Sequence, residues 1–343
     1  MFSSRSMRLF KGVVTASVVT ASVVALSAAG ASATSPHAAV PRAKKLVVAF
    51  EVGSEADPFF QSMYVGASAE AKKLGVTLIW QGDPVNYSPA TQIPIVEQLL
   101  ALKPNALIIA PTDPKALEPY TTQAIKQGAL VLNVDSGQAN QKPITAWVTG
   151  NNVQGGTEAA QALASAMGYA TNCTASSPCT VAVGVSSITT STDAARVAGF
   201  DAELKKKYPH IVALNPIVSQ SQPSVAQSGF SQDISAHNLK GIFAVDGTDA
   251  EGAASAIAAS GKTDIKVVAY DAYATNIASM QAGKIAAIIA QQPTLEGKLI
   301  VQYAVTKLRN PKAKVPHLTT LPNILLTPAS SAATLAKYQY VAS

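Results

Sequence analysis

Four short apolar segments, each the length of a buried strand, are closely followed by side chains that can bind a polar ligand. These side chains are Asp135, Asp246, Asp271 and Gln291. The carboxylates accept hydrogen bonds, and the amide both donates and accepts. In open parallel sheets, ligands bind beyond the carboxyl ends of the strands. We therefore expect these four residues to meet at one polar site.

Apolar segments of about five residues alternate along the chain with longer amphipathic segments. The predicted strands are 46–50, 76–80, 106–110, 129–133, 180–185, 211–214, 241–245, 265–270, 285–290 and 323–326. The predicted helices are 58–74, 90–102, 114–127, 153–167, 193–207, 224–237, 249–260, 274–282, 295–308 and 330–337. Continuous apolar strands between helices are typical of parallel sheets covered on both faces. The sequence predicts an α/β fold with two doubly wound parallel-sheet lobes.

Residues 1–33 have the three parts of a secretory signal peptide. Basic residues come first, an apolar stretch follows at 13–29, and Ala31-Ser32-Ala33 is a small-residue cleavage site. Serines and threonines within the stretch argue against a membrane anchor. The chain has no cysteine near this cleavage site, so we expect no lipid anchor on an N-terminal cysteine. The mature protein is predicted to be exported to the periplasm or the medium and not to be embedded in a membrane.

The charged residues argue against a nucleic-acid partner. The chain has 26 Lys and Arg against 20 Asp and Glu, a formal net charge of +6. Part of that excess lies in the predicted signal peptide, and the remaining charges are interspersed. Nucleic-acid binding needs a basic stripe, which this sequence lacks.

The two cysteines, Cys173 and Cys179, lie six residues apart in a turn-rich stretch. In an oxidising compartment this spacing favours a disulfide. A zinc site would need further ligands, and the histidines are not at ligand spacing. We therefore expect a disulfide, with no metal and no cofactor.

The segment after the first strand, Asp57-Pro58-Phe59-Phe60, resembles a signature of the type I periplasmic binding proteins. The likeness is to the ribose/galactose-like branch, whose members are sugar receptors of ABC importers. Further motifs follow in the order of that family between Leu46 and Leu308. The resemblance implies that Asp57 bonds a ligand and that Phe59 or Phe60 stacks on a sugar ring. A ring with an apolar face and a hydroxyl rim suits such a pair.

The same resemblance implies a larger set of ligand-binding residues. It adds Arg196 as a donor and Tyr270 as an aromatic wall, and it makes acceptors or polar contacts of Asp135, Asp246, Asp271 and Gln291. Ser136 departs from the family pattern, which has an arginine there. An arginine donates through a rigid fork that serine lacks, so this change argues against ribose itself.

The resemblance also implies hinge segments between the lobes and a division of the chain. We assign 1–33 to the signal peptide, 34–45 to a linker, 46–150 and 292–317 to lobe 1, and 151–291 and 318–343 to lobe 2. The implied function is capture of a monosaccharide or polyol by hinge closure, followed by delivery to the permease of an ABC transporter. We expect a monomer without enzymatic activity, because no phosphate loop, nucleophile elbow or zinc motif is present. A receptor for a nucleoside or a signal molecule, in chemotaxis or quorum sensing, is the alternative.

Overall fold

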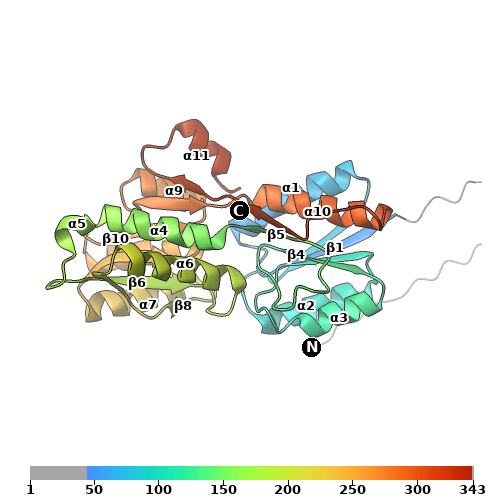
Figure 1. Ribbon diagram of the computed structural model, residues 1–343, viewed down its shortest axis with the longest axis horizontal. Coiled ribbons are helices and arrows are strands. Elements are labelled where there is room, and N and C mark those ends of the chain that lie inside the picture. Colours follow the sequence, from blue (N-terminus) through green and yellow to red (C-terminus); the bar gives the residue numbers. More distant parts are fainter. Residues whose placement is uncertain (1–44, 342–343) are drawn as a thin grey trace, which may run out of the picture. The chain divides into compact units, whose positions relative to one another are not determined.

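The computed structural model describes residues 45–341 and contains two β-sheets (Figure 1). The predicted signal peptide and nearly all of the predicted linker lie outside the described residues. The first sheet has the order β12-β5-β4-β3-β1-β2, with all neighbours parallel. Its strands are β1 (Val47–Val52), β2 (Thr77–Gly82), β3 (Ala106–Ile109), β4 (Leu130–Val134), β5 (Trp147–Gly150) and β12 (Leu318–Leu321).

Helices cover both faces of this sheet. Figure 1 shows α2 and α3 on one face and α1 and α10 on the other; the bounds are α1 (Pro58–Lys73), α2 (Pro89–Ala101), α3 (Glu118–Lys126) and α10 (Pro293–Arg309). Alternate residues of one strand serve the two faces: Leu107 belongs to the core under α2, and Ile108 to the core under α1 and α10. Because both faces are buried, the strands read as continuous apolar runs.

The second sheet repeats this arrangement. Its order is β13-β11-β10-β9-β6-β7, with β8 paired to β6 and β13 antiparallel to β11. The strands are β6 (Cys179–Val185), β7 (Ile211–Ala213), β8 (Ile217–Val218), β9 (Leu239–Ala244), β10 (Lys266–Tyr270), β11 (Ala287–Ala290) and β13 (Ile324–Leu326). The helices are α4 (Asn152–Ala166), α5 (Tyr169–Asn172), α6 (Ser191–Lys207), α7 (Pro223–Ala236), α8 (Gly247–Ser260), α9 (Ala274–Gln281) and α11 (Ala332–Tyr338). In this second lobe α4 packs on α6, and α7 packs on α8.

The chain passes between the two sheets three times: from β5 to α4, from β11 to α10 and from β12 to β13. Hydrogen bonds join these crossings to one another. The Asn323 side chain donates to the Asn151 carbonyl at 2.8 Å, and the Gln292 side chain donates to the Pro322 carbonyl at 2.9 Å. The crossings therefore form one connected segment between the lobes.

The structure corrects the predicted chain division at its C-terminal side. We assigned everything from residue 318 to lobe 2, but β12 pairs with β5 in the first sheet, and the chain leaves this sheet only after Leu321. Strands β5 and β12 were also absent from the predicted elements. Each is four residues long and mixes polar with apolar residues at or next to the sheet edge, so neither gives a continuous apolar signal. Within the described residues, no helix is long and apolar enough to span a membrane.

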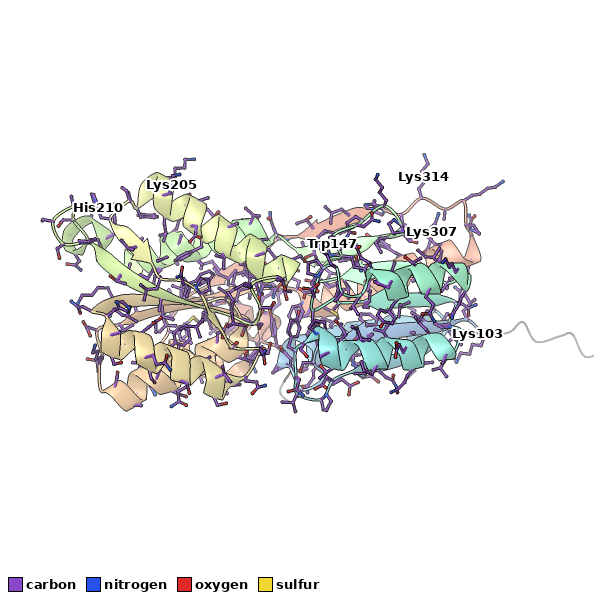
Figure 2. All side chains as sticks on the ribbon, turned by 90° about the horizontal axis from the view of Figure 1, so that it is seen from below. Lys103, Trp147, Lys205, His210, Lys307 and Lys314 are labelled. Carbon is purple, nitrogen blue, oxygen red and sulfur yellow. A yellow bond between two sulfur atoms is a disulfide. The ribbon has the colours of Figure 1, made fainter. Side chains whose placement is uncertain are left out.

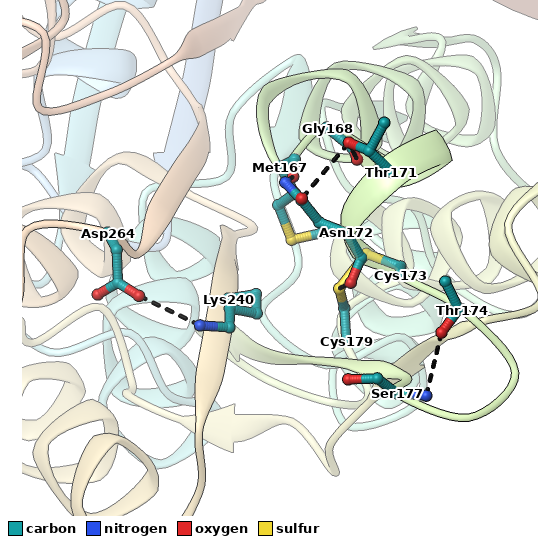
Figure 3. The surroundings of a disulfide bond; sticks show 10 residues. All are labelled: Met167, Gly168, Thr171, Asn172, Cys173, Thr174, Ser177, Cys179, Lys240 and Asp264. Carbon is teal, nitrogen blue, oxygen red and sulfur yellow. Dashed lines mark hydrogen bonds and ion pairs between the residues drawn. A yellow bond between two sulfur atoms is a disulfide. The ribbon is translucent and has the colours of Figure 1, made fainter.

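The predicted disulfide is confirmed. Cys173 and Cys179 are bonded between the end of α5 and the start of β6, and the Thr174–Ser177 turn lies between them (Figure 3). Cys179 is the first residue of β6. The disulfide therefore lies at the amino ends of the strands, on the side of the second sheet opposite to their carboxyl ends. Lysines such as Lys205 and Lys314 extend away from the ribbon (Figure 2), as expected for interspersed surface charge.

Candidate functional site

Two aspartates at corresponding places in the two sheets have unusual backbone conformations. Asp135 follows β4 with φ 54°, and Asp271 follows β10 with φ 67°. Left-handed backbone is uncommon for residues with a side chain, although aspartate tolerates it better than most. Such strain is concentrated at functional sites. Here it turns the chain directly after each strand and leaves both carboxyl groups buried.

One cavity gathers the strand ends of both lobes. Asp57, Phe59, Phe60, Tyr87 and Asp135 line it from the first lobe. From the second lobe come Ser186, Thr192, Asp193, Arg196, Ser221, Asp246 and Asp271, with Gln291 contributed by the crossing after β11. The predicted convergence of Asp135, Asp246, Asp271 and Gln291 is therefore present in the structure.

Asp57 and the two phenylalanines stand at the start of α1. The Asp57 carboxylate caps this helix by accepting from the Phe59 backbone N–H at 2.8 Å. Such caps stabilise a helix by about 1 kcal/mol. Phe59 and Phe60 are buried edge to face, with ring centroids 5.2 Å apart. Proline at the first helical position allows the helix to begin immediately after the cap.

Arg196 is the cation of the cavity, and its guanidinium is held on several sides. Nε donates to the Asn152 side chain at 2.8 Å, and Nη1 donates to the Val245 carbonyl at 3.0 Å. The guanidinium carbon lies 4.0 Å from the centroid of the Tyr270 ring. Asp193, one helical turn earlier on α6, lies 3.8 Å from Nη1. Its position is thus fixed before any ligand arrives.

Asp271, in the second lobe, bonds to the crossing after β11 and to the C-terminal segment. Its Oδ1 accepts from the Gln291 side chain at 2.8 Å and from the Tyr340 hydroxyl at 3.1 Å. Its Oδ2 accepts from the Gly247 backbone N–H at 3.2 Å. Burial raises the pKa of Asp271, although Arg196 and the Gln291 hydrogen bond act in the opposite direction.

Asp246 caps α8 in the same way that Asp57 caps α1. Its Oδ1 accepts from the Asp249 backbone N–H at 2.9 Å and from the Thr248 hydroxyl at 2.6 Å. The Ser186 hydroxyl donates to Oδ2. The carboxylate is therefore oriented into the cavity by its neighbours.

Three cavity carboxyls have strongly raised pKa values. Burial, joined by repulsion from Asp271, raises the pKa of Asp57 to about 7. Burial likewise raises the pKa of Asp135 and of Asp193 to about 7, and in both cases Arg196 partly offsets the effect. Like charges confined together in a dry site disfavour simultaneous ionisation.

Contacts between the lobes close the cavity. The Tyr273 hydroxyl donates to Asp57 at 2.5 Å, and the Thr190 hydroxyl donates to the Thr112 carbonyl at 2.7 Å. The Gly137 backbone N–H donates to the Ser191 hydroxyl at 2.8 Å. The residue pairs are 54 to 216 positions apart in the chain, so these contacts depend on the lobes being together.

Tyr270 is the one predicted site residue that does not line the cavity. It is fully buried beneath Arg196, and its hydroxyl accepts from the Asn323 side chain at 3.3 Å. A Cβ on Gly155 would lie 1.5 Å from this hydroxyl, so only glycine fits there. Alternation along β10 explains the difference, because Tyr270 points to the α4 face of the sheet. Its ring supports the arginine and does not form a cavity wall.

Several residues at the site were not predicted. Asp193 had a usable signal, because it precedes Arg196 by three residues and so shares its helix face. Tyr273 and Tyr340 had none, since their contacts depend on how the lobes and the C-terminal segment meet.

Ser136, the departure from the family pattern, donates to the Pro111 carbonyl at 2.7 Å within its own lobe. Among residues 45–341, no group of three or more acidic, histidine or cysteine side chains is arranged to hold a metal ion.

Known proteins share both this fold and this sequence pattern. A family model described as a periplasmic binding protein domain matches residues 48–312. The ribose import binding protein of Bacillus subtilis (strain 168) is 29% identical over 271 residues, covering 79% of this chain and 84% of that protein. The chain therefore belongs to the periplasmic binding protein domain family, and the predicted type I fold is confirmed.

Two solved structures illustrate the likeness. An ABC transporter solute-binding protein from Agrobacterium vitis, with bound alpha-D-tagatopyranose, has a TM-score of 0.80 and 28% identity, covering 87% of this chain and 100% of that chain. A carbohydrate transporter solute-binding protein from Agrobacterium radiobacter, in complex with D-arabinose, has a TM-score of 0.80 and 25% identity, covering 87% and 99%.

Proposed function

We propose that this protein is the solute-binding component of an ABC importer and captures a monosaccharide or polyol between its two lobes. The observation that carries the proposal is the convergence of strand ends from both sheets on one polar cavity. That cavity combines carboxylates, a guanidinium, an amide and two phenylalanine rings. The ribose import binding protein and the two solute-binding proteins solved with alpha-D-tagatopyranose and with D-arabinose support a sugar-like ligand.

The chemistry of the lining suits a polyhydroxylated ring. Asp57, Asp246 and Asp271 accept from hydroxyl groups, and Arg196 donates to ring or hydroxyl oxygens. Hydrogen bonds to charged groups contribute about 1.5–3 kcal/mol each. Phe59 and Phe60 offer apolar area to the C–H face of a sugar. Each acceptor is oriented by its neighbours, which reduces the loss of entropy on binding.

Capture requires the lobes to move. The cavity holds about 30 Å³, whereas ordinary small-molecule pockets hold at least about 300 Å³. The three chain crossings, bonded through Asn151 and Asn323, are the natural hinge. Hinge closure around a ligand is a common transition in two-lobed proteins. The closed, loaded form would then deliver the ligand to the permease.

We further propose that the protein is an exported, monomeric binding protein without enzymatic activity. Two of the cavity carboxylates are held by fixed donors: Asp57 by Phe59 and Tyr273, and Asp271 by Gln291 and Tyr340. Carboxylates oriented by such donors support recognition of ligand hydroxyls. Turnover of a bound sugar would overturn this part of the proposal.

A thermal-shift screen tests the function. The purified protein is heated with D-ribose, D-allose, D-tagatose, D-arabinose, sorbitol, nucleosides and amino acids. A ligand that binds only the folded state adds about 2.7 kcal/mol of stability at 100 times its dissociation constant. Stabilisation by one sugar or polyol class supports the proposal. Stabilisation by a nucleoside or amino acid alone, or by none, contradicts the sugar assignment.

A further inference from the structure

We propose that the ligand of this cleft carries a protonated amine, as an amino sugar or an aminopolyol does. This inference rests on the proposed function and narrows its substrate class. It follows from the charges of the lining, from the buried oxygen atoms that lack hydrogen-bond partners, and from the contacts that already hold Arg196.

The lining is unbalanced in charge. Five carboxyl groups face the cavity, from Asp57, Asp135, Asp193, Asp246 and Asp271, against the single guanidinium of Arg196. A neutral sugar would leave most of these carboxylates buried together without a counter-charge. Buried charges without partners are strongly unfavourable. A cationic ligand supplies the missing charge on closure.

Arg196 cannot neutralise the group alone. Among residues 45–341, its pair with Asp193 is the one ion pair formed by any carboxylate of the lining. Two further sides of the guanidinium are occupied by Asn152 and Val245, and Tyr270 lies under its plane. The contacts of the guanidinium are therefore all with residues of the second lobe. Asp57 and Asp135, on the first lobe, have no basic side chain as an ion-pair partner in the described part of the chain.

Two residues that line the cavity each carry a buried oxygen without a partner. Oδ1 of Asp135 and Oε1 of Gln291 are buried and have no hydrogen-bond partner among the described residues. Their residues are 5% and 2% exposed, and both line the cavity. An ammonium group has three donors and no acceptor. Because Gln291 also bonds Asp271, an ammonium beside Asp135 and Gln291 would lie close to two carboxylates.

The protonation of the cleft fits the same ligand. Burial, with repulsion from neighbouring aspartates, raises the pKa of Asp57, Asp135 and Asp193 to about 7, so near neutral pH these carboxyls are partly protonated when no cation is bound. An ammonium ion favours their ionised forms and would displace protons on binding. The titratable or charged groups around them are Asp246, Asp271, Asp249, Glu296, Arg196, Tyr87, Tyr270, Tyr273 and Tyr340.

Calorimetric titrations with matched pairs of compounds test the inference. Each pair differs only in the amine: glucosamine with glucose, galactosamine with galactose, and 1-amino-1-deoxysorbitol with sorbitol, with N-acetylglucosamine as a neutral control of larger size. We expect at least one amine to bind about tenfold or more tighter than its neutral partner, a difference of about 1.4 kcal/mol. Acetylation of the nitrogen should abolish that preference. Titration in two buffers should show protons released on binding.

A matched variant locates the effect. Asp135→Asn keeps the size of the side chain, and asparagine tolerates the left-handed backbone, so we expect it to remove most of the preference for the amine. Asp264→Asn, at an exposed ion pair with Lys240, is the control and should leave the preference unchanged. If the neutral partners bind as tightly as the amines, the inference is wrong and the proposed function stands. If neither kind binds to folded protein, both are wrong.

Discussion

The hydroxyl of Tyr273 donates to the carboxylate of Asp57 across the two lobes, at 2.5 Å. Asp57 belongs to the N-terminus of α1 in the first lobe, and Tyr273 to the turn before α9 in the second. The same carboxylate also caps α1. One side chain therefore couples a helix start, a wall of the cavity and the contact between lobes.

Removing this contact should weaken the closed form. In Tyr273→Phe the buried Asp57 carboxylate loses a donor, and hydrogen bonds to charged groups contribute about 1.5–3 kcal/mol. We expect ligand affinity to fall about tenfold or more, and the distance between fluorophores placed on the two lobes to increase. Tyr169→Phe, near the disulfide end of lobe 2, is the matched control. Unchanged affinity in Tyr273→Phe would show that the contact plays no part in closure.

Asp271 should be the most sensitive carboxylate in the cleft. Asp271→Asn keeps its shape and tolerates its positive φ, so the fold should survive. The amide lacks the charge that would hold ligand hydroxyls, and we expect affinity for the captured ligand to fall at least about tenfold. Calorimetry measures the affinity, and urea unfolding checks the fold. An affinity within twofold of the wild type, in a well-folded variant, would place the binding site elsewhere.

Tyr340 should act as a positioning residue. Its hydroxyl donates to Asp271 and accepts from the Gln291 backbone N–H at 2.9 Å. Tyr340→Phe leaves both groups buried without this partner, which costs about 1–3 kcal/mol. We expect lower stability and weaker binding together, whereas Tyr338→Phe, on the half-buried side of α11, should change neither. Loss of stability with unchanged affinity would limit Tyr340 to a structural role.

The raised pKa values predict how stability depends on pH. Asp57, Asp135 and Asp193 titrate near 7 in the folded chain and near 3.8 otherwise. Between these values the folded chain binds more protons than the unfolded chain, so the free energy of unfolding falls as pH rises. Burial raises the pKa of Asp249 and Glu296 in the same direction. The ligand-free protein should be more stable at about pH 5.5 than at about pH 8.

Urea unfolding at several pH values measures this dependence. Asp135→Asn removes one of the raised carboxyls, so its stability should change less with pH than that of the wild type. Asp113 and Asp264 have lowered pKa values, so they change the free energy of unfolding only below about pH 4. They therefore do not affect the comparison between about pH 5.5 and about pH 8. Stability that rises from about pH 5.5 to about pH 8 would contradict the assigned shifts.

The disulfide should matter for stability and not for binding. Cys173 and Cys179 close a short loop at the amino end of β6, away from the cavity at the carboxyl ends. Replacing both with serine should lower the free energy of unfolding by about 2 kcal/mol. Ligand affinity measured by calorimetry should stay the same. A large loss of affinity would show that this loop influences the cleft.

Much of the site could be predicted because the carboxyl ends of all parallel strands in a doubly wound sheet lie on the same side, where ligands bind. The positions of the strands alone were enough to predict that Asp135, Asp246 and Gln291 lie together at the carboxyl ends. Tyr270 was misplaced because its orientation depends on the pleat of β10 at a single residue. The hydroxyls of Tyr273 and Tyr340 reach the site through the way separate segments pack, and nothing in the local sequence encodes that packing.

The most direct test of the central claim is a calorimetric titration of the wild-type protein and of Asp271→Asn with D-allose, D-tagatose, D-arabinose, sorbitol and glucosamine. The account predicts saturable one-site binding of at least one compound to the wild type, and its loss in a variant that still unfolds cooperatively. Binding of none of them, or binding that survives the substitution unchanged, would contradict a sugar-binding cleft centred on Asp271.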